Sequence, residues 1–185
     1  MFFTELFKYC PCCGSENFEQ HNIKSKHCRD CDFVYYINPS AAVAAFILNS
    51  KNELLVCTRK KEPAKGTFDL PGGFIDYNET AEQAIAREIK EELGGEIVSA
   101  EYLFSLPNDY LYSNLTIPTM DLFYLCKLKD DDDLHPADDV AEFQFLPLAT
   151  INPEKFGLNS IKKAVKRIKS EEPRSRGFAI CALHT

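Results

Sequence analysis

Three glutamates near the middle of the chain have a spacing that suits a divalent cation. Glu88, Glu91 and Glu92 fall within five residues, and on a helix residues three or four apart are neighbours. Each like-charged pair disfavours a helix by roughly 0.2–0.5 kcal/mol, and acids near its C-terminal end by about 0.3–1 kcal/mol each. Clustered violations of stability rules usually mark a functional site. Because Mg²⁺ prefers carboxylate oxygens, the cluster predicts a site for a hard cation.

The segment that must carry these acids has helix signals at both ends. Thr80 and Gln83 have the spacing of a capping box, which starts a helix at Ala81. Gly94 and Gly95 come directly after position 93, and glycine accepts the left-handed conformation that ends many helices. We therefore predict a helix over 81–93.

Glu92 conflicts with the apolar face of this predicted helix. Four apolar residues recur along one side of it: Ala81, Ile85, Ile89 and Leu93. Glu92 projects between the first two of them, and an unpaired buried carboxylate would cost several kcal/mol. A solvated acidic face would account for Glu82 and Glu91 but not for Glu92, which a bound cation explains.

A cysteine cluster near the start of the chain predicts a second metal site. Two pairs have the Cys-x2-Cys spacing of zinc knuckles: Cys10, Cys13, Cys28 and Cys31. They can offer four thiolates to one tetrahedral Zn²⁺, whose filled shell indicates a structural role. A segment of about thirty residues lacks an adequate core, so metal binding would supply the missing folding free energy. The alternatives are thiols without metal, or His27 as a substitute ligand; Cys12 is the spare thiol.

The chain around these two sites reads as alternating strands and helices. Apolar runs at 41–48 and 53–58 flank a turn-like stretch and predict a strand hairpin. Strand-like segments follow near 96–106, 116–127 and 142–147, and a second helix is expected over about 159–169. The acids of 130–133 are read as a solvated loop. Cys57, Cys126 and Cys181 lie singly in apolar surroundings and are expected to be small buried hydrophobes.

Composition excludes several classes of protein. The 185 residues carry a formal net charge of −7, whereas a protein that coats nucleic acid normally has a basic excess. No apolar run approaches the roughly 18 residues needed to cross a bilayer, and the opening residues are too short and too acidic for a signal peptide. We therefore expect a cytoplasmic protein without a membrane partner, in which disulfides are the weaker explanation of the cysteines.

The residues of the predicted helix and the loop before it resemble the signature of the Nudix hydrolases. That signature runs Gly, five residues, Glu, seven residues, then Arg-Glu-aliphatic-x-Glu-Glu-x-Gly-aliphatic, and it corresponds here to Gly73, Glu79, Arg87, Glu88, Ile89, Glu91, Glu92 and Gly94. Gly95 departs from it, because an aliphatic residue is usual there, and this affects packing behind the helix. The preceding Leu70-Pro71-Gly72-Gly73 is also family-like.

The resemblance covers roughly residues 39–168 and implies a fold. Nudix proteins are α/β, an α/β/α sandwich with a mixed sheet between helices. With the cysteine segment added, the expected organisation is a small N-terminal zinc ribbon at 1–38, a Nudix hydrolase domain at 39–170 and a C-terminal tail at 171–185. The apolar stretch 178–183 of the tail could join a partner, and a homodimer is one expectation.

The resemblance also implies roles for individual residues. Carried over by position, Glu88 and Glu92 are the main ligands of Mg²⁺ or Mn²⁺, and Glu91 assists them. A backbone carbonyl of Gly72 or Gly73 completes the shell. Arg87 orients the carboxylates by pairing with Glu79. Glu88 is one candidate for the group that takes the proton of the attacking water, a role in which members of the family differ. Asp139 or Glu142 is expected as an additional ligand.

A zinc ribbon followed by a Nudix domain resembles the NADH pyrophosphatase branch. That branch carries a Ser-Gln-Pro-Trp-Pro-Phe-Pro segment after the signature, whereas this chain has Ser-Leu-Pro-Asn-Asp-Tyr-Leu-Tyr-Ser at 105–113 and contains no tryptophan. ADP-ribose or another nucleoside diphosphate derivative therefore fits as well as NADH. Tyr110 and Tyr112 could stack on a base, and Arg59, Lys60 and Lys65 could attract phosphates.

The expected function is metal-dependent hydrolysis of a diphosphate linkage in a small nucleotide derivative. The metals would neutralise diphosphate oxygens and lower the pKa of a bound water. The alternative is a non-catalytic sensor that binds a nucleotide while its ribbon contacts protein or nucleic acid. Sensors of that kind usually lose signature acids, and this chain keeps Glu79, Glu88, Glu91 and Glu92.

Overall fold

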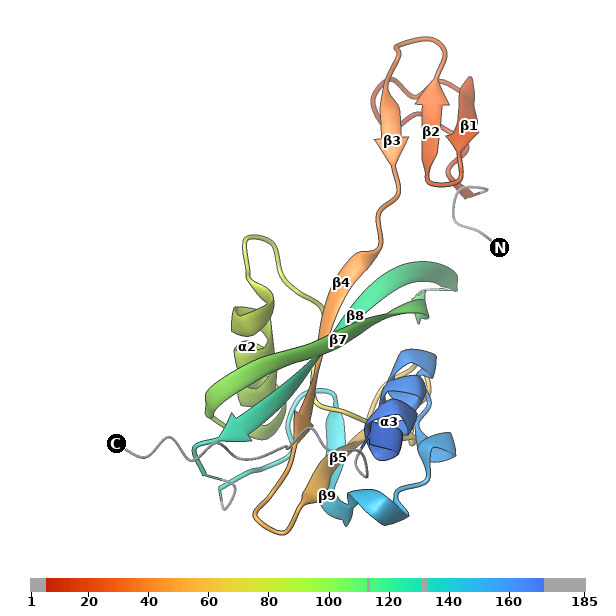
Figure 1. Ribbon diagram of the computed structural model, residues 1–185. Helices are drawn as coiled ribbons and strands as arrows, with labels where there is room; N and C mark the ends of the chain where they lie inside the picture. The colour runs from red at the N-terminus through yellow and green to blue at the C-terminus, as the bar shows by residue number, and fades with distance from the viewer. Residues whose placement is uncertain (1–5, 113, 131–132, 172–185) are drawn as a thin grey trace.

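The structure is a computed structural model that describes residues 6–112, 114–130 and 133–171. It contains a small N-terminal sheet and a larger α/β body, joined by a short extended stretch (Figure 1). The predicted tail falls almost wholly outside the described residues, and so do Cys181 and two residues of the acidic run at 130–133. Within the described part, no helix is both long and apolar enough to cross a membrane.

The N-terminal sheet is antiparallel and has strands β1 (Phe18–Asn22), β2 (Ser25–Cys28) and β3 (Val34–Tyr36) in that order. Its core is minimal: Cys10, Phe18 and Cys28 are buried, with two further aromatic rings packed against them. Two of these three buried residues are predicted zinc ligands. The stability of this segment therefore depends on the same thiols that would bind the metal.

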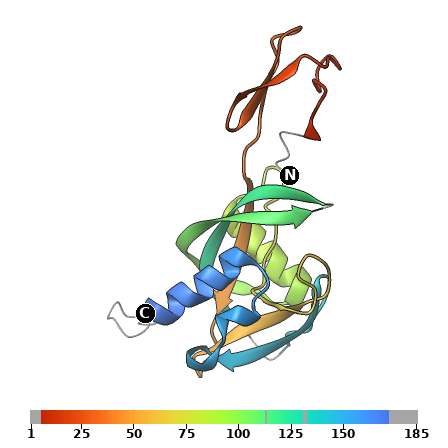
Figure 2. The same cartoon turned by 90° about the vertical axis from the view of Figure 1, so that its right-hand side faces the viewer.

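The larger body is built on two sheets. β4 (Ser40–Ile47) pairs in parallel with β8 (Leu115–Leu128), which pairs antiparallel with β7 (Ile97–Tyr112), giving a mixed sheet. β5 (Glu53–Arg59) lies between β6 (Phe68–Asp69) and β9 (Val140–Pro147) in an antiparallel sheet. Helix α2 (Ala81–Leu93) lies on one side of the strands and α3 (Asn159–Glu171) on the other (Figures 1 and 2). Short turns η1 (Leu148–Thr150) and η2 (Pro153–Lys155) precede α3. The predicted α/β fold with a mixed sheet is confirmed.

Alternation along the central strands explains this sandwich. In β4, Ala44 and Phe46 pack in the core that contains α3, whereas Val43, Ala45 and Ile47 pack in the core that contains α2. β5 alternates in the same way. Successive side chains of a strand point to opposite faces, so a strand that is apolar throughout is buried on both sides.

The predicted hairpin of the first two apolar runs is wrong in its pairing. The turn is present, and the Asn49 side-chain oxygen accepts hydrogen bonds from the backbone N–H groups of Lys51 and Glu53 at 2.9 Å. Only one bridge, between Leu48 and Leu54, joins the two runs. The strands then diverge into different sheets, where each finds long partners. Apolar patterning predicts burial but does not name the neighbouring strand.

Helix α2 has the boundaries that its capping signals predict. The Thr80 side chain accepts a hydrogen bond from Gln83 N–H, and the Gln83 side chain accepts one from Thr80 N–H. Gly94 ends the helix in the left-handed conformation with φ of 70°. The unusual Gly95 also has a packing reason, because a Cβ there would lie 3.0 Å from the Leu134 side chain and 3.2 Å from that of Ile89. Leu134 thus fills the space that an aliphatic residue would occupy.

Candidate active site

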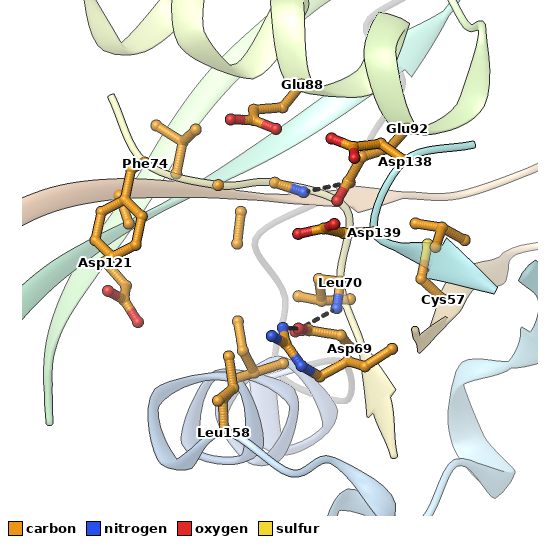
Figure 3. Close-up of a pocket in the computed structure, with 18 of the residues that line it drawn as sticks. Cys57, Asp69, Leu70, Phe74, Glu88, Glu92, Asp121, Asp138, Asp139 and Leu158 are labelled. Carbon is orange, nitrogen blue, oxygen red and sulfur yellow. Dashed lines mark hydrogen bonds and ion pairs between the residues drawn. The ribbon is translucent and has the colours of Figure 1, made fainter. Parts of the chain in front are cut away.

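A pocket of about 370 Å³ opens where α2, the two sheets and the start of α3 meet (Figure 3). Apolar residues of the strands and many acids line it. Glu88, Glu91, Glu92, Asp138 and Asp139 line it, together with Asp69, Asp121, Arg59 and Arg87. The acids that the sequence places on one helix therefore line a cavity, although Glu91 is also exposed to solvent.

Glu92 is buried, as its position in the apolar stripe predicts. Its side chain is only 7% exposed and its Oε2 accepts a hydrogen bond of 3.0 Å from the backbone N–H of Gly72. Gly72 has φ of +146°, and a Cβ at this position would lie 2.1 Å from the Val43 carbonyl oxygen. Only glycine can follow this path beneath β4. The loop thereby brings a backbone N–H to a carboxylate at the buried end of α2.

The second signature glycine makes room for Glu88. A Cβ at Gly73 would lie 2.4 Å from Glu88 Oε1, so this side chain packs directly on the bare backbone. The Gly73 carbonyl accepts the N–H of Val43 at 2.8 Å. The Gly72 carbonyl accepts no hydrogen bond from the part of the chain that the structure describes. Of the two predicted carbonyl ligands, Gly72 is therefore the one with free capacity.

Arg87 holds three glutamates at once. Its Nε and Nη2 donate to the two oxygens of Glu79, each at 2.9 Å. Its Nη1 donates to Glu88 at 2.8 Å and to Glu91 at 3.2 Å, and Nη2 also donates to the Phe74 carbonyl at 3.0 Å. These contacts with acids raise the pKa of Arg87 above its usual value, the Glu79 hydrogen bonds most of all, and the same bonds lower the pKa of Glu79. The expected pair of Arg87 with Glu79 is present.

The site concentrates more negative charge than the described protein groups neutralise. Burial raises the pKa of Glu92 to about 8, and the charges of Glu88, Asp69 and Asp139 add to this shift although the Gly72 hydrogen bond opposes it. Burial also raises the pKa of Glu88, while Arg87 opposes the rise. A carboxylate cluster with raised pKa values and a free carbonyl fits the oxygen donor set of a hard divalent cation.

The loop before β9 supplies two further acids. Asp138 and Asp139 line the pocket, and both pair with Lys61. Asp138 has a positive φ of 43°. Glu142, the other candidate ligand of this region, lies outside the pocket and accepts a hydrogen bond from the Thr58 hydroxyl at 3.2 Å. Of the two predicted extra ligands, geometry favours Asp139.

Of the residues expected to bind substrate, Arg59 and Tyr110 line the pocket and Tyr112 does not. Arg59 pairs with buried Asp69, and its Nη2 lies 3.5 Å from the Tyr110 hydroxyl. Tyr112 is 59% exposed, and Lys60 and Lys65 also lie outside the pocket lining.

The sequence reasoning missed a second set of pocket residues. Phe74, Asn108, Thr119 and Asp121 all line the cavity, and Asp121 is only 6% exposed. The sequence does contain a signal for Asp121. It is an acid within the apolar run of β8, which is the same kind of conflict that identified Glu92. Asp69 likewise lies in a short strand before the signature loop and is 7% exposed.

The four predicted zinc ligands converge in the N-terminal segment. The sulfur atoms of Cys10, Cys13, Cys28 and Cys31 all lie within 4.8 Å of one another, with Sγ–Sγ distances of 3.7 Å for Cys10–Cys31 and 3.6 Å for Cys13–Cys28. A tetrahedron with Zn–S bonds of about 2.3 Å has an edge of about 3.8 Å, whereas a disulfide would need about 2.05 Å. Cys12 is exposed and outside the cluster, and His27 pairs with Asp32 at 3.3 Å. The cluster has the geometry of a zinc ribbon.

Comparison with known proteins assigns the larger body to a family. The NUDIX domain profile matches residues 38–167. The chain is 30% identical over 104 residues to the NAD-capped RNA hydrolase NudC of Vibrio vulnificus, covering 56% of this chain and 39% of that protein. It is 49% identical over 59 residues to the ADP-ribose pyrophosphatase of Methanocaldococcus jannaschii, covering 32% of this chain and 34% of that protein. This chain thus spans well under half the length of both relatives.

A solved structure extends the likeness to almost the whole fold. The NUDIX hydrolase from Nitrosomonas europaea superposes with a TM-score of 0.68 at 26% identity, covering 90% of this chain and 92% of that one. The profile match runs from β4 into α3. It includes the acids of the pocket, the loop with Gly72 and Gly73, and Arg87. Since the matched region covers more than half of the 185 residues, the chain belongs to the NUDIX domain family.

Proposed function

We propose that this chain hydrolyses a diphosphate linkage in a nucleotide derivative with Mg²⁺ or Mn²⁺ as cofactor. The observation that carries this proposal is Glu92, a carboxylate that is 7% exposed and lines a pocket together with other acids of α2 and the neighbouring loops. Buried carboxylates are normally paired or bound to metal. Glu92 has no ion pair within the described chain, since its described hydrogen bond comes from a backbone N–H.

Several groups on the pocket wall would hold the cation. Glu88 and Glu92 are the main carboxylate ligands in this proposal, with Glu91 and Asp139 beside them and the Gly72 carbonyl as a neutral donor. When bound, the metal would neutralise diphosphate oxygens and activate water for attack on phosphorus. The four thiols of the ribbon would hold a separate Zn²⁺ with no open position, which makes that metal structural.

The protein's own groups have distinct tasks in this scheme. Arg87 fixes Glu88 and Glu79 in one orientation, so that the carboxylates converge before a metal arrives. Glu88, half-buried and with a raised pKa, is a candidate to accept the proton of the attacking water. Arg59, held by Asp69 at the pocket edge, presents positive charge to the phosphates.

The substrate class follows from the names of the relatives together with the pocket. One relative is named for ADP-ribose and the other for NAD-capped RNA, and both names describe a nucleotide with a diphosphate. We propose ADP-ribose, NADH or another nucleoside diphosphate derivative as the substrate. The net charge of −7 favours small molecules over RNA.

The test is product analysis on a panel with Mg²⁺ or Mn²⁺: ADP-ribose, NADH, nucleotide sugars, nucleoside triphosphates and an NAD-capped RNA. We expect rapid cleavage of one class at the diphosphate, and a loss of at least about a thousandfold in Glu92→Gln, since the variant loses a metal-binding charge. Glu101→Gln is the matched control, because Glu101 is an exposed acid outside the pocket lining.

A nucleotide sensor is the alternative, and one result would establish it instead. Tight nucleotide binding by zinc-loaded protein, with no cleavage of any compound in the panel by the wild type, would overturn the hydrolase proposal. Cleavage that survives unchanged in Glu92→Gln would overturn the assigned metal site while leaving an enzyme.

A further inference from the structure

One buried carboxylate of the pocket has no role in the proposed hydrolysis. Asp121 lies on β8, lines the pocket and is 6% exposed. In Figure 3, Asp121 and Phe74 lie on one side of the cavity, and Glu92, Asp138 and Asp139 lie on the other. It therefore lies apart from the acids that are proposed to bind the metal.

Hydroxyl groups, not a cation, hold Asp121. Thr119 Oγ1 donates to Oδ1 at 2.7 Å, and Ser160 Oγ on α3 donates to Oδ2. No ion pair with Asp121 occurs within the described chain, whereas the other buried aspartate of the pocket, Asp69, pairs with Arg59. Each carboxylate oxygen can accept a further hydrogen bond. Asp121 is therefore oriented by two neutral donors and keeps capacity to accept a hydrogen bond from a ligand.

Aromatic and aliphatic side chains line the same pocket as Asp121. The rings of Phe74 and Tyr110 meet edge to face with centroids 5.4 Å apart, and both line the pocket. Leu158, in the loop before α3, and Ile161, on α3, also line the pocket. Aromatic and aliphatic side chains favour contact with a planar ring of the substrate. A carboxylate in the same pocket would pair with a hydrogen-bond donor on that ring.

We propose that Asp121 is a specificity-determining residue that accepts a hydrogen bond from an amino group on the nitrogenous ring of the substrate. This inference rests on the proposed function, in which the substrate is a nucleotide derivative. It also fixes the direction of binding, since a carboxylate repels phosphate and so the diphosphate lies toward the metal-binding acids. A ring with a carboxylate substituent, or with a carbonyl oxygen in place of the amino group, is disfavoured at this end.

Two exocyclic NH₂ groups could supply the donor, the amino group of adenine and the carboxamide of nicotinamide. Analogues separate them. ADP-ribose is compared with its hypoxanthine counterpart, and NAD⁺ with its hypoxanthine and nicotinic acid counterparts. Dissociation constants are measured by calorimetry in the Glu92→Gln background, where turnover is suppressed, and compared with the same constants after adding Asp121→Asn.

We expect the Glu92→Gln protein, in which Asp121 is intact, to bind the ligand with the NH₂ group about tenfold or more tightly than its analogue, because hydrogen bonds to charged groups are of that strength. In Asp121→Asn this ratio should fall toward one. The analogue that is discriminated against identifies which ring lies at Asp121. Asp109→Asn is the matched control, since Asp109 is an exposed acid of β7 outside the pocket lining.

Equal dissociation constants for ligand and analogue in the Glu92→Gln protein would overturn the inference. So would a ratio of these constants that does not change when Asp121→Asn is added. In both cases hydrolysis by the wild type could still hold. Absence of both binding and cleavage of every probe by the wild type with Mg²⁺ or Mn²⁺ would overturn the inference and the proposed function together. If Asp121→Asn does not fold, Thr119→Val removes one of the orienting hydroxyls at nearly constant volume. It should lower the same ratio, whereas a purely structural role would change all affinities equally.

Discussion

At the scale of single residues, Arg87 shows why charge alone does not build this site. A guanidinium offers donors in a fixed planar fork, so one arginine reaches both oxygens of Glu79 and still contacts Glu88 and Glu91. Lysine carries the same charge on a single nitrogen. Replacing Arg87 by lysine therefore tests whether the site needs the planar geometry of the guanidinium or only its positive charge.

Arg87→Lys should lower kcat by about 10- to 100-fold, the usual loss when a group that orients metal ligands is removed. The metal concentration for half-maximal rate should rise, because Glu88 loses its fixed direction. Steady-state kinetics over a Mn²⁺ titration measures both quantities. Arg29→Lys, which alters an exposed pair with Glu19 in the ribbon, should change neither. Equal kinetics for wild type and Arg87→Lys would show that charge suffices.

Glu92 imposes a stability cost on the metal-free protein. In EDTA, Glu92→Gln should raise the free energy of unfolding by about 1–3 kcal/mol, and the melting temperature by about 2–4 °C per kcal/mol. The folded-state pKa is raised to about 8, so the cost grows from the unfolded pKa near 4.3 up to pH 8 and then levels. Melting curves at pH 5 and pH 8 should therefore show the larger gap at pH 8. A gap that shrinks toward pH 8 would contradict the burial argument.

Prediction of single residues from sequence succeeded where one helix alone showed an acid within an apolar face. Glu92 could be identified because its neighbours on the helix define a buried face, and the structure buries it. Tyr112 and Glu142 were expected at the site but lie outside the pocket lining. Their positions depend on how far a strand extends and which way its end turns, and spacing along the chain does not contain that information.

At the scale of elements, the loop from Leu70 to Gly73 is what joins α2 to the mixed sheet. The carbonyls of Pro71 and Gly73 accept hydrogen bonds from Ala45 and Val43 on β4, each at 2.8 Å. The loop therefore lies along this strand while its Gly72 N–H reaches the helix end. Any side chain at Gly72 would force these two attachments apart.

Gly72→Ala should destabilise the protein by more than Gly66→Ala and should also abolish activity. Both glycines have positive φ, so both variants carry backbone strain of about 1 kcal/mol. Only at Gly72 does the new Cβ meet backbone, 2.1 Å from the Val43 oxygen, whereas nothing lies within 4 Å at Gly66. Chemical denaturation and activity measure the difference. Equal losses in the two variants would mean that the loop can move away from β4 at little cost.

The elements themselves were predictable to different degrees. Helix α2 matched its predicted bounds because capping residues fix both ends locally. The strand pairings did not follow from the pattern, and β7 runs to Tyr112, beyond its predicted end. Strand β7 gains its length from the register with β8, a contact between segments that no local signal specifies.

At the scale of the whole molecule, the two proposed metal sites belong to two separate cores. The ribbon core of Cys10, Phe18 and Cys28 shares no residue with the two cores that enclose the mixed sheet. Folding of the ribbon should therefore depend on zinc, while the larger body should not.

A chelator strong enough to remove Zn²⁺ should release one equivalent per chain and unfold only the ribbon. We expect the main thermal transition to stay within about 2 °C, while a protease cleaves selectively before residue 38. Cys28→Ser should reproduce this state, and Cys12→Ser, which changes an exposed thiol outside the cluster, should retain the zinc. Collapse of the main transition on zinc removal would show that the ribbon supports the larger body.

The ribbon is attached by a very short path. β3 ends at Tyr36, Ile37 still donates to the Lys24 carbonyl at 2.7 Å, and β4 begins at Ser40. Ala42, only four residues after Asn38, already lines the pocket, and four extended residues span at most about 14 Å. Whatever the ribbon binds is thereby tethered to the larger body by a short path, which gives an effective concentration in the millimolar range. A weak contact on the ribbon would suffice to lower the apparent KM of a substrate large enough to touch both parts, without altering the KM of a small one.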